Sequence, residues 1–164
     1  MRAEEIPPFL ISLGEREGAT DVAVKLGESH DTMIRFSNNE ITVGKHWHEL
    51  EAEIFVMVEK GRAGTTTGLL TTQNLGSLMR RLVNMAKTSP PAEVYAPLPN
   101  GPFRYDYSLL EPSRAPPTPE KLVGYVEEAI NAAREAGAQR VAGSLISSNS
   151  KVTIQTSGGA CVEE

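Results

Sequence analysis

The residues with the clearest capacity for chemistry lie in one short stretch, "KHWHELEAE", at positions 45–53. It holds two of the three histidines, His46 and His48, and the only tryptophan of the chain. His48 and the glutamate after it match the first half of HExxH, a helical motif in which two histidines bind zinc and the glutamate activates water. The motif is not completed, because Ala52 and Glu53 stand where HExxH and HExxxH need their second histidine.

The same stretch alternates with a period of two residues, which is typical of a strand rather than a helix. On a strand, His46 and His48 would project from one face, and His30 could supply a third ligand to a metal ion there. The alternative is a partly exposed strand face whose histidines pair with neighbouring glutamates at the surface. We favour this alternative, and therefore predict no catalytic residue and no metal-binding residue. If the chain did bind a metal ion, the candidate ligands would be His30, His46 and His48.

Other patterns that suggest chemistry lack the neighbours that their motifs need. "GRAGTTTG", at 61–68, has glycines but not the Gly-Lys-Ser/Thr ending of a phosphate-binding P-loop. Ser157 precedes two glycines without the GxSxG of a nucleophile turn, and Cys161 is a lone cysteine near the end. We therefore expect a hairpin at 61–68, a turn at Ser157 and an ordinary thiol at Cys161. The sequence does not identify substrate-binding residues.

Composition limits the classes of protein that this chain can represent. Its 164 residues suit one domain, residues 1–164, and a net charge of -5 argues against nucleic acid as a direct partner. A single cysteine excludes an internal disulfide framework. No apolar run reaches the roughly 20 residues that span a bilayer, and "MRAEEIPPFL" lacks the basic head of a signal peptide. These features predict a cytoplasmic protein without a membrane partner.

Periodicity and capping residues predict an α+β (mixed α/β) fold, with a largely antiparallel sheet and about three helices mainly on one face. The Asn residues between Phe36 and Ile41 favour a tight hairpin. A helix over 74–87, capped by Thr72 or Asn74, should bury Leu75, Leu78, Leu82, Met85 and Ala86. The other expected elements are a helix over 6–19, strands over 21–29, 31–39, 40–61 and 61–72, a helix over 118–138, and a closing hairpin over 139–159 that turns at 148–150. The strands over 40–61 and 61–72 should pair across a turn at 59–64.

A proline-rich arm, residues 89–119, separates the last two helices and contains nine of the eleven prolines. Prolines at this density continue neither a helix nor a central strand. Tyr95, Phe103, Tyr105 and Tyr107 also lie in the arm, and these aromatic residues favour an arm that wraps over the domain.

Three segments in order resemble the N-terminal domain of the TldD/PmbA (TldE) family, once labelled modulator of DNA gyrase. They are "DTMIRFSNNEIT", "EKGRAGTTTGLLTTQNLGSLMRRLVNMAKTSPP" and "VTIQTSGG". The run "VGKHWHELEAEIFVMVEKGR" departs from the family, which has a shorter, more apolar and glycine-rich strand there. The resemblance implies that the chain is the N-terminal part of a longer two-domain protein.

The resemblance also implies a function. TldD-type members look like zinc metallopeptidases whose HExxxH helix lies beyond this domain, and PmbA/TldE-type members lack that motif and act as partner subunits. This chain would then contain no catalytic residue and no cofactor, with zinc only in a C-terminal part. Its partners would be a TldD- or TldE-like subunit, in a homo- or hetero-oligomer, and a peptide or unfolded-protein substrate. By itself it is not expected to be an enzyme.

Two other functions stay open at the level of sequence. The first is a stand-alone metal-dependent hydrolase that uses the cluster of His30, His46 and His48. The second is a purely structural oligomerisation domain that makes no contact with substrate.

Overall fold

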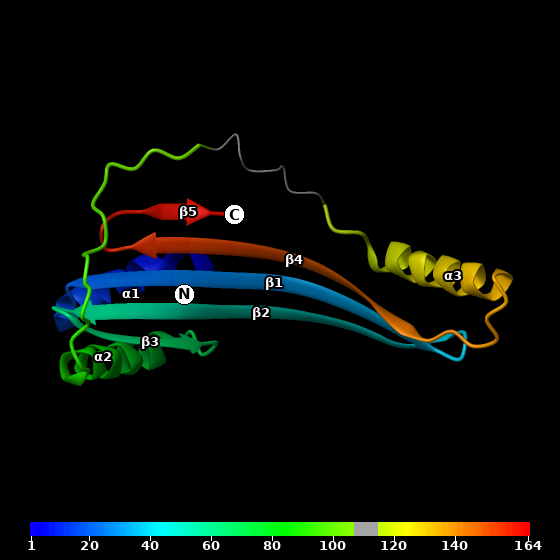
Figure 1. Cartoon of the computed structure of the whole chain (residues 1–164), viewed down its shortest axis with the longest axis horizontal. Coiled ribbons are helices and arrows are strands. Elements are labelled where there is room, and N and C mark those ends of the chain that lie inside the picture. The colour runs from blue at the N-terminus through cyan, green and yellow to red at the C-terminus, as the bar shows by residue number, and fades with distance from the viewer. Residues whose placement is uncertain (107–114) are drawn as a thin grey trace. The chain divides into compact units, whose positions relative to one another are not determined.

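The computed structural model describes residues 1–106 and 115–164 and confirms an α+β fold with a five-stranded antiparallel sheet (Figure 1). The strand order across the sheet is β3-β2-β1-β4-β5. Tyr107, predicted to belong to the aromatic arm, lies outside the described residues. The elements are η1 (Ala3–Glu5), α1 (Ile6–Glu17), β1 (Asp21–Ser37), β2 (Glu40–Val58), β3 (Gly61–Thr67), α2 (Thr72–Thr88), α3 (Pro119–Glu135), β4 (Gly143–Thr156) and β5 (Cys161–Glu163).

The two tight turns of the sheet use residues with positive φ. Asn38 and Asn39 have φ of 53° and 70°, as a two-residue hairpin between β1 and β2 requires, and the predicted turn is confirmed. Glu59 takes φ of 53° between β2 and β3. The register that follows this turn pairs Val58 with Gly61 and continues to Ala52 opposite Thr67.

Several predicted boundaries were wrong. β1 is one strand where two were expected, and β4 runs straight through 148–150, where a turn was expected. The hydroxyl of Ser148 donates to the buried carboxylate of Asp31 on β1, which holds β4 extended at this point. The chain turns later, after Thr156. Helix α2 is capped by Thr71, neither of the expected residues, and its buried stripe includes Met79, whereas Met85 is exposed.

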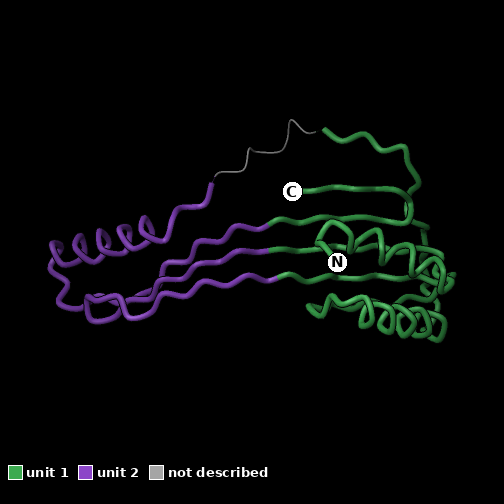
Figure 2. The backbone as a smooth tube through the Cα atoms, turned by 180° about the vertical axis from the view of Figure 1, so that it is seen from behind, with its two compact units in different colours: residues 1–28, 50–110, 151–164 green, residues 29–49, 111–150 purple. Residues whose placement is uncertain are grey.

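The chain forms two compact units (Figure 2). The first consists of residues 1–28, 50–110 and 151–164, and the second of residues 29–49 and 111–150. In the first unit, α1 and α2 pack on the face of the sheet that carries Val24, Ile54 and Val56. These side chains are fully buried because the alternation of β1 and β2 points them toward the helices.

The second unit has a smaller core, formed where α3 packs against the strands. Thr118 caps α3 and Pro119 takes its first turn, as predicted. Asn39 then ties the hairpin to the segment before β4: its side-chain amide donates to the Gln139 carbonyl, and its side-chain oxygen accepts from the Val141 amide. The buried residues of this core are Ile34, Leu122, Val126 and Ile130.

The described part of the proline-rich arm is attached to the first unit by hydrogen bonds. Asp21, 6% exposed, accepts from the Tyr95 hydroxyl at 2.6 Å and from the Leu98 amide at 3.1 Å. Farther along, the Gly101 amide donates to the Gly158 carbonyl. The arm therefore lies against the unit over these residues. No helix among the described residues is long and apolar enough to cross a membrane.

The hydrogen bond to Asp21 raises the pKa of Tyr95 above its ordinary value near 10. Because the protonated phenol is favoured in the folded chain, this contribution to stability is complete below pH 10 and is lost as pH rises through the folded pKa. Absorbance of the phenolate, followed during alkaline titration, should show a late-titrating tyrosine that Tyr95→Phe removes. Tyr125→Phe, at an exposed position of α3, should leave the late titration in place. A late-titrating tyrosine that is still present in Tyr95→Phe would contradict the hydrogen bond between Tyr95 and Asp21.

Candidate functional site

The second unit brings the three histidines together on one face. His46 and His48 alternate along β2, and His30 lies on β1. The ring of His30 stacks on that of His48, with centroids 4.3 Å apart and planes 9° from parallel, and lies 6.5 Å from that of His46. All three side chains are exposed. We call these three residues the histidine cluster.

Polar side chains next to the histidine cluster link β1 to its neighbouring strands β2 and β4. The Thr32 hydroxyl lies 3.0 Å from Nδ1 of His46. The Asp31 carboxylate accepts from the hydroxyls of Ser148 and Ser29, and these two bonds, the one from Ser148 first, lower the pKa of Asp31. Sequence reasoning missed Asp31 because it placed this residue at the start of a separate strand, 31–39, whereas β1 continues through it. The bond from Ser148 to Asp31 thus joins β4 to β1 at the residue that follows His30.

The helical zincin motif does not form at His48. Its segment is part of β2, as the alternation predicted, and Ala52 is fully buried in the first unit. Glu53 accepts a hydrogen bond from Lys25 at 2.7 Å. The other candidate nucleophiles make hydrogen bonds within the fold. The Ser157 hydroxyl accepts from the backbone amide of Val22, and the Cys161 sulfur accepts from the side-chain amide of Gln155.

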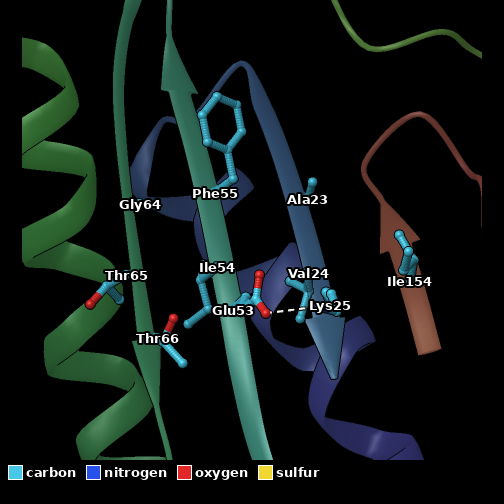
Figure 3. A pocket seen from close by; sticks show the side chains of 10 residues that line it. All are labelled: Ala23, Val24, Lys25, Glu53, Ile54, Phe55, Gly64, Thr65, Thr66 and Ile154. Atoms are coloured by element: carbon cyan, nitrogen blue, oxygen red, sulfur yellow. Dashed lines mark hydrogen bonds and ion pairs between the residues drawn. The ribbon is translucent and has the colours of Figure 1, made fainter. Parts of the chain in front are cut away.

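The first unit carries a second candidate surface, an open groove of about 470 Å³ on the sheet (Figure 3). The Lys25–Glu53 pair lies beside it, and Phe55 projects from β2. The hydrogen bond with Glu53 raises the pKa of Lys25. Phe55 is 38% exposed, and its signal in the sequence was an apolar residue among the outward-facing glutamates of β2. The groove thus combines apolar surface with one ion pair.

The edge strand β3 borders this groove. The Arg62 amide donates to the Ser89 hydroxyl at 2.8 Å and so points away from β2. Backbone groups of an antiparallel strand alternate in direction, so those of Gly64 and Thr66 also point to the outer side. In the register of the sheet, Gly64 lies opposite Phe55 and Thr66 opposite Glu53. The edge therefore presents backbone donors and acceptors next to the groove.

Comparison with known proteins gives a likeness of fold. No protein-family model and no curated protein matches the sequence. TldE from Thermococcus kodakarensis is similar in structure, with a TM-score of 0.75 and 22% identity, covering 99% of this chain and 36% of that one. A proposed modulator of DNA gyrase from Bacteroides thetaiotaomicron has a TM-score of 0.73 and 14% identity, with 98% and 38% covered. Another from Thermotoga maritima has a TM-score of 0.71 and 16% identity, with 98% and 36% covered.

The chain thus spans little more than a third of the length of each of these proteins. At these identities the likeness concerns the fold, and it extends over almost every residue of this chain. The chain has the fold found within TldE and the gyrase-modulator structures, in agreement with the resemblance seen in its sequence.

Proposed function

We propose that this chain is the N-terminal, non-catalytic domain of a TldD/PmbA-like protein that takes part in cytoplasmic proteolysis. In this function it pairs with a TldD- or TldE-like subunit and forms a wall of the space that encloses a peptide substrate. The observation that carries the proposal is the match of 98–99% of the chain to about a third of TldE and two gyrase-modulator structures. The order of the sequence segments gives independent support.

The zinc that the resemblance implies does not fit the residues of this chain. An HExxxH site needs two histidines on one face of a helix, and His48 lies on strand β2 with Glu53 at the second position. Glu53 is engaged with Lys25. We therefore assign the peptidase zinc, and the hydrolytic chemistry, to residues outside this chain.

The contribution of this domain to substrate binding is proposed to come from the edge of β3. An extended peptide can add to an exposed edge through main-chain hydrogen bonds, with alternate side chains on each face of the sheet. The outward backbone groups of Gly64 and Thr66 would supply the bonds. The groove beside Phe55 would receive peptide side chains, because Gly64 has none of its own. Such contacts suit unfolded substrates, since they depend little on sequence.

The proposal predicts that Thr66→Pro weakens peptide binding about fivefold, because it removes one outward donor worth about 1 kcal/mol. Edge strands tolerate proline where the amide points outward, so the fold should survive. Fluorescence polarisation of a labelled, unstructured ten-residue peptide would measure the change. The matched control is Thr72→Pro, at the first position of α2, where proline is favoured and affinity should not change.

Three outcomes, read from peptide binding, subunit pairing and peptide cleavage, would overturn parts of the proposal. Equal affinity of the Thr66→Pro and Thr72→Pro variants for the peptide would contradict the addition of a peptide strand at the edge of β3. A chain that pairs with a TldD- or TldE-like subunit but binds no peptide would be an oligomerisation domain. Cleavage of the peptide by this chain with added Zn²⁺, lost in His46→Gln, would instead support the stand-alone hydrolase.

A further inference from the structure

We propose that His30, His46 and His48 form a binding site for one divalent transition-metal ion of the zinc and copper class. One ligand atom of His30 lies within 4.8 Å of one of His48, whereas His46 lies farther out, with its ring centroid 6.5 Å from that of His30. Imidazole nitrogen is a preferred ligand of zinc, copper and nickel, whereas magnesium and calcium prefer oxygen. The donor set therefore selects this class of metal.

The surroundings orient His46 for this task. Its Nδ1 atom lies 3.0 Å from the Thr32 hydroxyl, which leaves Nε2 as the atom that faces a metal. Metal-binding histidines commonly use their second ring nitrogen in this way, which sets the tautomer and the direction of the ring. Thr32 therefore acts as a positioning residue in the proposed site.

The backbone supports the three imidazoles more firmly than a loop would. All three histidines lie on paired strands, and the bond from Ser148 to Asp31 ties β4 to β1 at the residue that follows His30. The rings stack in parallel, so metal binding requires rotation about the side-chain torsions to direct the nitrogens to a common point. The exposure of the three side chains leaves a coordination position for water.

The site does not depend on the proposed function. It involves neither an HExxxH helix nor the groove on the first unit, so either proposal can fail without the other.

Metal binding is tested on the whole chain with Zn²⁺ or Cu²⁺ alone, by calorimetry and by NMR of the imidazole C–H signals. Because the chain has only three histidines, each signal can be followed. We expect saturation at a single ion per chain, with all three sets of signals shifted by Zn²⁺ and broadened by Cu²⁺. His48→Gln and His46→Gln should each weaken binding at least about tenfold, and Thr32→Val should weaken it less.

Matched controls separate this site from adventitious binding. Glu49→Gln, on the same strand with its side chain on the opposite face, and Cys161→Ser should leave the affinity unchanged. Both histidine variants change exposed side chains, and their NMR spectra would report whether the fold is intact. Binding that is non-saturable, that survives His48→Gln, or that is lost in Glu49→Gln or Cys161→Ser would overturn the proposal.

Discussion

Replacing Gly61 with alanine is expected to lower the free energy of unfolding by about 3 kcal/mol, the upper range for forced overpacking. A Cβ atom at this position would lie 1.9 Å from the carbonyl oxygen of Ala86 and 3.0 Å from its carbon. Neither atom can rotate away, because both belong to the backbone of α2. The C-terminal turn of that helix would have to move, and with it the buried side chains of Leu82 and Val83.

Urea denaturation would measure this loss, and Gly76→Ala provides the matched control. Gly76 lies inside α2, and a Cβ atom there meets nothing within 4 Å. Its replacement should stabilise the helix by up to about 1 kcal/mol, since glycine is the poorer helix former. Similar unfolding curves for the two variants would mean that α2 does not approach β3 as closely as the structure shows.

Replacing Leu122 with alanine is expected to cost about 3 kcal/mol, within the range measured for large-to-small substitutions in cores. Leu122 is 3% exposed and, among the described residues, is one of four that are buried in the core of the second unit. A core this small has few other contacts to hold α3 in place. The loss should therefore appear as local opening of the second unit.

Hydrogen exchange followed by mass spectrometry would locate the effect. Amides of α3 should lose protection, whereas those of α1 and α2, whose core is separate, should keep it. Tyr125→Ala on the same helix, where the side chain is 52% exposed, should change protection little. A uniform loss of protection in α1, α2 and α3 would show that the two units open together.

Much of the local structure could be predicted because its causes are local. The stripe of α1, the proline at the start of α3 and the paired asparagines of the first hairpin all act within a few residues. The strand that carries His46 and His48 was predicted from alternation alone. The same signal correctly separated this segment from a helical zinc motif.

The failures have a different cause. Ser148, Asn149 and Ser150 favour a turn by their local hydrogen-bonding capacity, yet Ser148 donates to Asp31, 117 positions earlier. Gly61 was expected to serve the turn, but Glu59 takes the positive φ and Gly61 is required by the approach of α2. Neither contact leaves a periodic trace in the sequence.

The sequence by itself determined the fold class, the identity of most elements and the absence of a complete HExxH or HExxxH motif. It also carried the resemblance that the comparison of folds supports. Only the tertiary structure decided that the three histidines gather, that Phe55 opens onto a groove, and that Asp21 and Asp31 are buried partners. Periodicity reports which face of an element is apolar. The pairing of strands and helices far apart in the chain decides which side chains meet.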